Sequence, residues 1–292
     1  MDVSIIIVNY NTRDLILQCI SSIYEKTENL FFEIIVVDNN SIDDSVYYIE
    51  KEFPLVILIK SSENLGFGRA NNLGMQYAKG EYIFLLNSDT LLINNAIKLL
   101  YDYAEGHDKR AFYGCWLEDQ LGNYINSGNS IHTINNLLWN LFKSYIPWRH
   151  EGDRDVFYSD KLCYKIGYVS GADMFFHHTV YEETKGFDPH FFMYSEEVEW
   201  QRRASKLGIY SYLLNTPRIY HLCGGSQKIE SPSFNVARFR RFMTSRYYYI
   251  RKEYNNFQYI YYRVLNALLY LPKLLLGKSR SFAAVKILFE LI

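Results

Sequence analysis

A short polar segment, Asn87-Ser88-Asp89, directly follows an apolar run at residues 81–86 that is typical of a buried strand. In an open α/β sheet, ligands bind at the carboxyl ends of the strands, which is where Asp89 would lie. A carboxylate there can hold a divalent cation against a diphosphate, because hard cations take oxygen ligands and share them with phosphates. Taken alone, however, the segment is more typical of a turn at the end of a strand, since Asn, Ser and Asp all favour turns.

Two other apolar runs also end in polar residues. Residues 3–8 lead into Asn9-Tyr10-Asn11, and residues 32–37 lead into Asp38-Asn39-Asn40-Ser41. A parallel sheet places such strand ends on one edge. Asp38 could there form charge-assisted hydrogen bonds with a base or a ribose. Three polar strand ends together therefore predict a binding cleft.

The segment at residues 64–72 contains two glycines and leads into a predicted helix. Its glycines allow the backbone to approach a ligand closely, and Arg69 could meet a phosphate. No Gly-Lys-Ser/Thr follows, and the spacing is not that of a dinucleotide-binding Gly-x-Gly-x-x-Gly. The pattern argues against a nucleoside triphosphatase and against a dehydrogenase.

Further along the chain, residues 191–200 place three carboxylates after an aromatic patch. Glu196 and Glu197 are adjacent and cannot share one helix face. A carboxylate beside an apolar wall has a raised pKa, which suits a general base. The alternative is an acidic helix N-terminus favoured by the helix dipole. His221 precedes two glycines that permit close backbone approach, although a lone His is more often structural than a ligand.

The elements that must position these residues alternate between strand and helix. Apolar and β-branched runs predict strands at residues 3–8, 32–37, 55–60 and 81–86. Helical spacing predicts helices at residues 13–26, 43–53, 68–79 and 94–103, and Asn11 or Thr12 could cap the first of them. This alternation predicts an α/β fold with a doubly wound, mostly parallel sheet. Later helices are expected at residues 180–185, at 196–207 and from residue 234 onward.

Composition and charge limit the classes of protein. The chain has 292 residues, of which 49% are hydrophobic and 22% charged, so it is globular. Its net charge is −1, but residues 236–292 carry eleven Lys or Arg and only two Glu, a net of +9. A basic, aromatic and amphipathic tail is typical of a segment that lies on an anionic membrane surface. Alternatively, the tail packs on the acidic body or on the mate in a homodimer.

Other partners and compartments are disfavoured. The acidic body holds no recognised nucleic-acid module, so no nucleic acid is expected. The four cysteines are scattered, which predicts neither a zinc site nor a disulfide framework. No signal peptide is evident, and the apolar stretch at residues 264–272 is too short to span a bilayer. The expected location is the cytoplasm, either soluble or peripheral on the inner face of the cell membrane.

Six segments, in their order along the chain, resemble the motifs of family 2 glycosyltransferases, and most closely the bacterial rhamnosyltransferase-like branch. They are residues 3–11, 37–41, 64–68, 86–90, 186–188 and 192–202. The resemblance runs from residue 3 to about residue 226, and more loosely through residues 238–254. It implies a GT-A fold at residues 1–233, with a nucleotide-binding half (1–95) and an acceptor half (96–233), followed by a helical tail (234–292).

The resemblance also implies roles for single residues. Asp38 would contact the nucleobase or the ribose, and Asp89 would be the main metal ligand, with His221 near the metal or the diphosphate. Glu197 would be the catalytic base, although the family has Asp at this position, and Arg202 or Arg203 matches an arginine that follows the acidic pair. Acceptor binding is expected at Glu196, Gly171 and Ala172. Binding of the nucleotide sugar is further expected at Asn9, Tyr10, Asn11, Asn40, Asn64, Arg69, Asn87 and Ser88.

The function that follows is a metal-dependent, inverting sugar transfer in surface polysaccharide synthesis. The resemblance implies Mg²⁺ or Mn²⁺, a dTDP- or UDP-sugar donor with rhamnose as the expected sugar, and a saccharide or polyprenyl-linked acceptor. One alternative is a non-catalytic module that binds sugar nucleotides, because Asn87 and Glu197 both depart from the strict motifs. A second alternative, a nucleotidyltransferase, is disfavoured because no Gly-rich loop with Lys or Arg follows the first strand.

Overall fold

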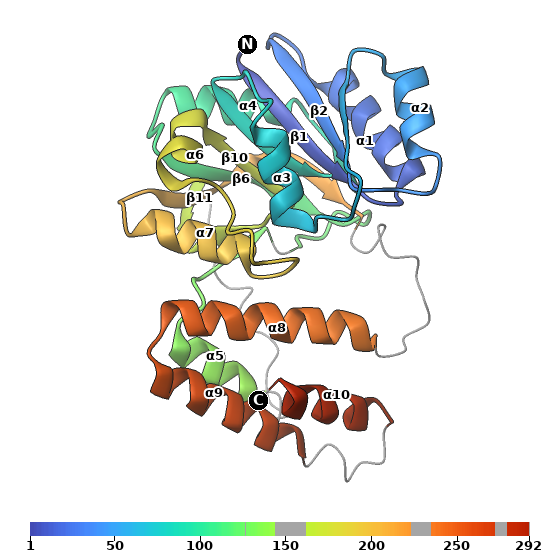
Figure 1. Cartoon of the computed structure of the whole chain (residues 1–292). Helices are drawn as coiled ribbons and strands as arrows, with labels where there is room; N and C mark the ends of the chain where they lie inside the picture. Colours follow the sequence, from blue (N-terminus) through green and yellow to red (C-terminus); the bar gives the residue numbers. More distant parts are fainter. Residues whose placement is uncertain (126, 144–161, 223–234, 272–278, 292) are drawn as a thin grey trace. The chain divides into compact units, whose positions relative to one another are not determined.

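The computed structural model describes residues 1–125, 127–143, 162–222, 235–271 and 279–291. The chain forms two compact units (Figure 1). The first, here the sheet unit, comprises Met1–Ile131, Asp160–Phe191 and Glu197–Ile229. The second, here the helical unit, comprises His132–Ser159, Phe192–Glu196 and Glu230–Ile292. The chain therefore leaves the sheet unit before Phe192 and returns to it at Glu197.

The first half of the sheet is parallel, as predicted. Its strands lie in the order β3-β2-β1-β4, with α1, α2 and α3 connecting them in sequence. The strands are β1 (Val3–Asn9), β2 (Phe32–Asp38), β3 (Ile57–Lys60) and β4 (Tyr82–Asn87). The helices are α1 (Arg13–Lys26), α2 (Ser45–Glu52) and α3 (Phe67–Met75). β1 and β4 are buried along most of their length, as continuous apolar runs covered on both faces should be.

The second half of the sheet is mixed. β10 (Asp173–His177) lies antiparallel between β4 and β6 (Ala111–Glu118), and β11 (Tyr210–His221) runs parallel to β6. β5 (Thr90–Leu92) and β8 (Cys163–Ile166) both pair antiparallel with β11, and β7 (Gly128–Asn129) with β9 (Tyr168–Val169) forms a separate small sheet. The helices of this half are α4 (Ala96–Glu105), α6 (His178–Thr184) and α7 (Glu196–Ser205).

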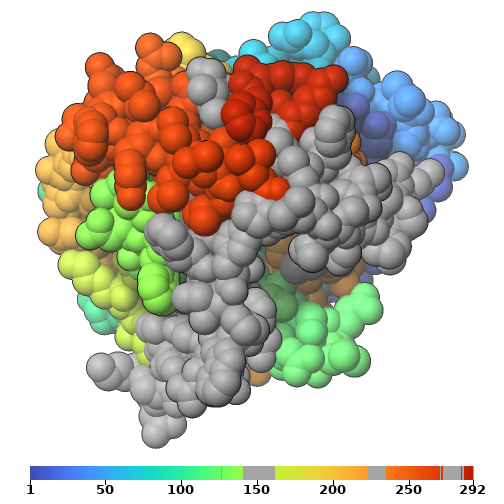
Figure 2. Space-filling model, turned by 90° about the horizontal axis from the view of Figure 1, so that it is seen from below, coloured from blue at the N-terminus to red at the C-terminus, as the bar shows by residue number. Residues whose placement is uncertain are grey.

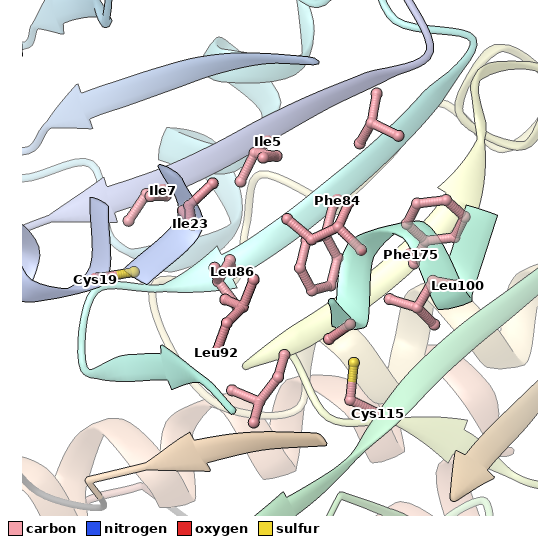
Figure 3. Close-up of a cluster of buried hydrophobic side chains, with 14 of the residues drawn as sticks. Ile5, Ile7, Cys19, Ile23, Phe84, Leu86, Leu92, Leu100, Cys115 and Phe175 are labelled. Carbon is pink, nitrogen blue, oxygen red and sulfur yellow. The ribbon is translucent and has the colours of Figure 1, made fainter. Parts of the chain in front are cut away.

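Alternating side chains of the central strands form two buried clusters. Ile5 and Ile7 of β1 join the cluster beneath α1 and α4, which contains Cys19 and Leu100 (Figure 3). Ile6, between them in sequence, joins the opposite cluster with α3, α6 and α7. A strand directs successive side chains to opposite faces, so the unit has a helix–sheet–helix layering.

The start of α1 differs from the sequence prediction. Neither candidate cap acts as one: the Thr12 side chain makes no capping hydrogen bond. Instead the Asp43 carboxylate accepts the Arg13 N–H at 2.8 Å and also the Ser45 N–H at 3.2 Å. The Asp43 carboxylate therefore accepts the backbone N–H of the first residue of both α1 and α2. α2 begins at Ser45 rather than at the predicted residue 43.

The helical tail predicted from residue 234 is present, and an earlier helix packs with it. The helical unit contains α5 (Ile134–Lys143), α8 (Val236–Glu253), α9 (Asn256–Tyr270) and α10 (Ser279–Glu290). The hydroxyls of Tyr249 and Tyr254 both donate to the His132 carbonyl, at 3.0 and 2.9 Å. Tyr247 and Tyr249 are buried inside this unit, so these aromatics form its core rather than its surface. Within the described residues, no helix is both long and apolar enough to cross a membrane.

Candidate active site

The three polar strand ends predicted from the sequence lie on one edge of the sheet. Asn9 is aligned with Asp38 across the β1–β2 pair, and Val8 is aligned with Asn87 across the β1–β4 pair. The Asn9 amide donates to the Asp38 carboxylate at 2.9 Å and lies 3.1 Å from the Ser41 hydroxyl. The Ser41 N–H donates to the other Asp38 oxygen at 3.0 Å. Asp38, only 3% exposed, therefore holds two strand ends together.

Thr12 connects the first strand end to the third. Its hydroxyl lies 2.7 Å from the Asn9 side-chain oxygen and 2.9 Å from the Ser88 hydroxyl. Asn9, Thr12 and Ser88 are all buried, so these bonds are shielded from water. The sequence prediction treated Thr12 only as a helix cap. The signal that could have revealed this role was its position between two polar strand ends.

More exposed residues surround this buried network. Tyr10 and Asn40 are exposed, and Asn11 and Asn40 adopt left-handed backbone conformations with φ of 54° and 67°. The Asn11 side chain accepts the Ile42 N–H at 2.8 Å, and its own N–H donates to the Ser41 hydroxyl at 3.0 Å. Asn tolerates this conformation better than most residues. The exposed edge is therefore a set of tight turns that present polar groups to solvent.

The glycine-containing segment is held against the second strand end. Asn39 donates to the Asn64 side chain at 3.0 Å and accepts the Leu65 N–H at 2.8 Å. Asn64 in turn accepts the Gly66 N–H at 2.9 Å. The Arg69 guanidinium donates to the Leu65 carbonyl at 2.7 Å, so it braces its own loop. Asn64 and Arg69 thus shape this loop in the structure, and their predicted roles toward a donor remain predictions.

Asp89 and His221 form the most direct pair of candidate metal ligands. β5 and β11 pair antiparallel with Thr90 opposite His221, which brings the His221 ring to 3.3 Å from the Asp89 carboxylate. The Leu222 N–H also donates to the Asp89 carbonyl at 2.9 Å. The Asp89 and His221 side chains are 6% and 17% exposed, so both are largely buried. The predicted glycines after His221, Gly224 and Gly225, lie outside the described residues.

The two ligands fit a cation that is shared with a substrate. No cluster of three or more His, Cys, Asp or Glu suited to a metal occurs in the described parts of the chain. Mg²⁺ in phosphate-binding enzymes often takes only one or two protein ligands, with phosphate oxygens and water supplying the rest. An oxygen and an imidazole nitrogen would also suit Mn²⁺. The pair can therefore hold a cation together with a diphosphate.

Gly171 and Ala172 connect this edge to Glu197. The Ala172 carbonyl accepts the Asn87 N–H at 3.0 Å, which fixes the segment before β10 beside the end of β4. A Cβ placed at Gly171 would lie 3.0 Å from the Phe67 ring and 3.9 Å from the Glu197 Cβ. The glycine therefore allows α7 to approach this segment closely. The sheet unit brings Asn87, Gly171 and Glu197 into one continuous set of contacts.

α7 is fixed to the sheet unit at several points. The Gln201 side chain accepts the Val169 N–H at 2.7 Å and donates to the Val169 carbonyl at 2.8 Å. Arg203 pairs with the fully buried Glu199 at 3.0 Å and donates to the carbonyls of Thr184 and Gly186. Arg203 therefore has a structural role in holding α7. No sequence signal indicated the role of Gln201.

The two adjacent glutamates have different surroundings, as their spacing predicted. Glu196 is 3% exposed, whereas Glu197 is partly exposed. Burial of its carboxyl raises the pKa of Glu197, and nearby N–H groups of Glu197 and Val198 offset part of that rise. A raised pKa gives a carboxylate more basicity at neutral pH. The geometry therefore makes Glu197 the better candidate for a group that exchanges protons with a ligand.

Comparison with known proteins identifies the family. The model described as Glycosyl transferase family 2 matches residues 4–203, which include the three polar strand ends at Asn9, Asp38 and Asn87. The chain belongs to this family. The matched range ends within α7, so it includes Glu197 but not His221.

Curated relatives share about a third of the aligned residues. The chain is 34% identical over 110 residues to a poly(ribitol-phosphate) beta-glucosyltransferase of Bacillus spizizenii, covering 36% of this chain and 17% of that protein. It is 30% identical over 116 residues to TarP, a poly(ribitol-phosphate) beta-N-acetylglucosaminyltransferase of Staphylococcus aureus, covering 38% and 36%. It is 34% identical over 122 residues to the Escherichia coli glucosyltransferase WfaP, covering 38% and 48%. The chain thus spans less than half the length of each of these relatives.

Solved structures confirm the fold class. GalNAc-T7, crystallised with UDP, GalNAc and Mn²⁺, aligns with a TM-score of 0.58 at 16% identity, covering 83% of this chain and 47% of that one. TarS of S. aureus aligns with a TM-score of 0.54 at 15% identity, covering 92% and 43%. The fold predicted from the sequence, an α/β fold of GT-A type with a helical tail, is therefore confirmed.

Proposed function

We propose that this protein is an inverting glycosyltransferase that moves a sugar from a nucleotide-diphosphate sugar to a hydroxyl of a saccharide or lipid-linked saccharide. The observation that carries the proposal is the Asp89–His221 pair, 3.3 Å apart. The hydrogen bond from the Asn87 N–H to the Ala172 carbonyl, and the close approach of Gly171 to Glu197, connect the end of β4 beside Asp89 to Glu197. A transferase of this kind needs a place for the leaving diphosphate and a base for the attacking hydroxyl. These residues supply both.

In the proposed reaction, the Glu197 carboxylate accepts the proton of the acceptor hydroxyl as its oxygen attacks the anomeric carbon. The bond between that carbon and the diphosphate oxygen breaks, so the configuration inverts and the nucleoside diphosphate leaves. General-base assistance of this kind contributes about 10²–10⁴-fold to a rate. The burial that raises the pKa of Glu197 increases its basicity toward the hydroxyl.

Asp89 and His221 would hold Mg²⁺ or Mn²⁺ at the diphosphate. When bound, the cation supplies Lewis-acid stabilisation of the charge on the leaving group. Asp38, with Asn9 and Ser41 bonded to it, would receive the nucleoside at the neighbouring strand ends. Its carboxylate oxygens have capacity for further hydrogen bonds, since each oxygen can accept two.

The names of the relatives suggest which donors and acceptors to test first. The name of WfaP specifies UDP-glucose and a sugar-diphosphoundecaprenol acceptor, and TarP is named for poly(ribitol-phosphate). These relatives make UDP-hexoses the first donors to test, with dTDP-rhamnose, expected from the sequence, beside them. Saccharides carried on polyprenyl diphosphate or on a polymer are the proposed acceptors, in surface polysaccharide synthesis.

The function is tested in two stages with the full chain. Thermal unfolding in UDP, dTDP and GDP, each with and without Mn²⁺, should show a nucleotide- and metal-dependent rise in Tm, because a ligand that binds the native state stabilises it. Donors of the nucleotide that binds are then assayed for release of nucleoside diphosphate. Stabilisation without turnover on any donor would support a non-catalytic sugar-nucleotide-binding protein. The absence of any nucleotide-dependent shift would reject both.

A further inference from the structure

One face of α9 is apolar and exposed. Phe257, Ile260, Tyr261, Val264 and Leu268 are 78%, 58%, 48%, 42% and 52% exposed. Their spacing places all five within an arc of about 100° on an α-helix. The stripe extends along about 17 Å of the helix axis. Single exposed apolar residues are ordinary, but a continuous exposed stripe on one helix marks an interaction surface.

The opposite face of α9 is the one that packs inside the helical unit, and it is the more polar of the two. Asn266 is 1% exposed and donates to the Tyr247 hydroxyl of α8 at 3.1 Å. Tyr262, on the same side, is also buried. The charged residue of α9, Arg263, donates to the Tyr259 hydroxyl at 2.6 Å and lies over the Tyr247 ring. The buried side of α9 thus carries polar groups such as Asn266, whereas the five stripe residues are apolar and exposed, the reverse of the usual pattern of a helix on a water-soluble surface.

The three C-terminal helices carry a strong excess of positive charge. Helices α8, α9 and α10 together contain nine Lys or Arg and two Glu, and α9 contains no acidic residue. Arg251 and Lys252 are exposed at the end of α8, just before the cap residue Asn255 that starts α9. Trp139, 59% exposed, lies on α5, which packs against α9. Figure 2 shows side chains of the helical unit, coloured orange to red, at the molecular surface.

We propose that the exposed face of α9 is a docking surface for an anionic lipid bilayer. The apolar stripe would enter the interfacial region of the bilayer while Arg251 and Lys252 meet the lipid headgroups. The helix is too short to span the hydrocarbon core, so it would lie in the plane of the interface. An exposed Trp on a neighbouring helix suits the same environment, where its ring is partly apolar and partly wet.

Charge complementarity favours this occupant over a second copy of the chain. Two copies meeting through α9 would bring two positively charged helical units together, and like charges across an interface are unfavourable. An anionic bilayer offers the opposite charge together with an apolar layer. The surface is independent of the transfer chemistry, so its test needs no donor or acceptor.

The test is co-sedimentation of the full chain with phosphatidylcholine vesicles, with and without phosphatidylglycerol. The chain should bind the anionic vesicles and bind pure phosphatidylcholine weakly. Ile260→Glu with Val264→Glu places two charges on the stripe and should weaken binding by about 10-fold or more. Arg251→Gln with Lys252→Gln should weaken binding to the anionic vesicles by about 5-fold per residue. Leu121→Glu, at an 87% exposed position of the sheet unit, is the matched control and should bind as the wild type does.

The substituted side chains are exposed, and Glu is a better helix former than Ile or Val, so the variants should fold. Circular dichroism melting verifies this. Equal binding of anionic vesicles by the Ile260/Val264 variant and by the wild type would overturn the proposal. A second result would also overturn it: the wild type does not bind vesicles, is a dimer by light scattering, and becomes a monomer in the Ile260/Val264 variant. In that case α9 would be a self-association surface.

Discussion

The Ser245 hydroxyl of α8 donates to the Met193 carbonyl at 2.7 Å, which ties the C-terminal helices to the segment directly before Glu197. That segment, Phe192–Glu196, packs with the helical unit. Tyr194 and Ser195 within it have φ of 76° and 68°, a left-handed conformation that non-glycine residues rarely adopt. Such strain persists only where surrounding contacts enforce it. The tail therefore supports a strained turn at the start of α7.

Ser245→Ala should impair catalysis through this turn. Loss of one buried hydrogen bond costs about 0.5–1.5 kcal/mol, which corresponds to about a 2- to 10-fold lower kcat if the turn positions Glu197. KM for the donor should change little, because the strand ends are untouched. Thr244→Ala, at the exposed neighbouring position of α8, is the control. A lower Tm with an unchanged kcat would show that the bond is structural only.

Glu197→Gln should lower kcat by about 10²–10⁴-fold, because it keeps the size of the side chain and removes its basicity. The wild-type rate should rise with pH through the raised pKa of Glu197, since only the ionised carboxylate accepts the proton. Glu196→Gln is the matched comparison at the neighbouring, more buried position. If Glu196→Gln were inactive while Glu197→Gln kept its rate, the base would be Glu196.

Asp89→Asn and His221→Ala should each lower the affinity of the enzyme for the metal and the metal-stimulated rate. Removal of an electrostatic stabiliser of this kind typically costs about 10²–10³-fold in kcat. The measurement is a titration of activity with Mn²⁺, where both variants should need more metal than the wild type. His107→Ala, an exposed histidine stacked on Tyr103, serves as the control. Wild-type activity that persists in excess chelator would contradict the metal role of the pair.

The parallel half of the fold was predictable because its signals are local. Continuous β-branched runs such as residues 3–8 mark strands covered on both faces, and polar residues at their ends mark the edge of the sheet. The antiparallel insertion of β10 between β4 and β6 was not predictable, because strand pairing depends on contacts distant in sequence. The mixed half of the sheet therefore emerged only from the structure.

The same distinction applies to the candidate site. Asp38 and Asp89 were predicted from their positions after strands, and the structure brings their strand ends to one edge of the sheet. Thr12 was misinterpreted, because a Thr before a helix usually caps it, whereas here its hydroxyl bonds to Asn9 and Ser88. The attachment of Gln201 to Val169 spans 32 positions of sequence, and no local pattern reports such a contact.

Asp173 carries a cost in stability that depends on pH. It is fully buried on β10: one carboxylate oxygen accepts the Cys115 N–H at 2.6 Å, and the other has no hydrogen-bond partner within the described structure. Burial raises the pKa of Asp173 well above its ordinary value. The folded state thus binds the proton more tightly than the unfolded state does. Stability is then lost as pH rises from the unfolded pKa toward the folded one, by about 1.4 kcal/mol per pH unit.

Asp173→Asn should remove this dependence while keeping an oxygen for the Cys115 N–H. The variant and the wild type should have similar free energies of unfolding below about pH 4, where the carboxyl is protonated in both states. The variant should become progressively more stable than the wild type as pH increases. Urea unfolding across a pH series measures the difference directly. A difference in the free energy of unfolding that stays constant with pH would mean that Asp173 has the same pKa in the folded and unfolded states. Its burial would then not disfavour ionisation.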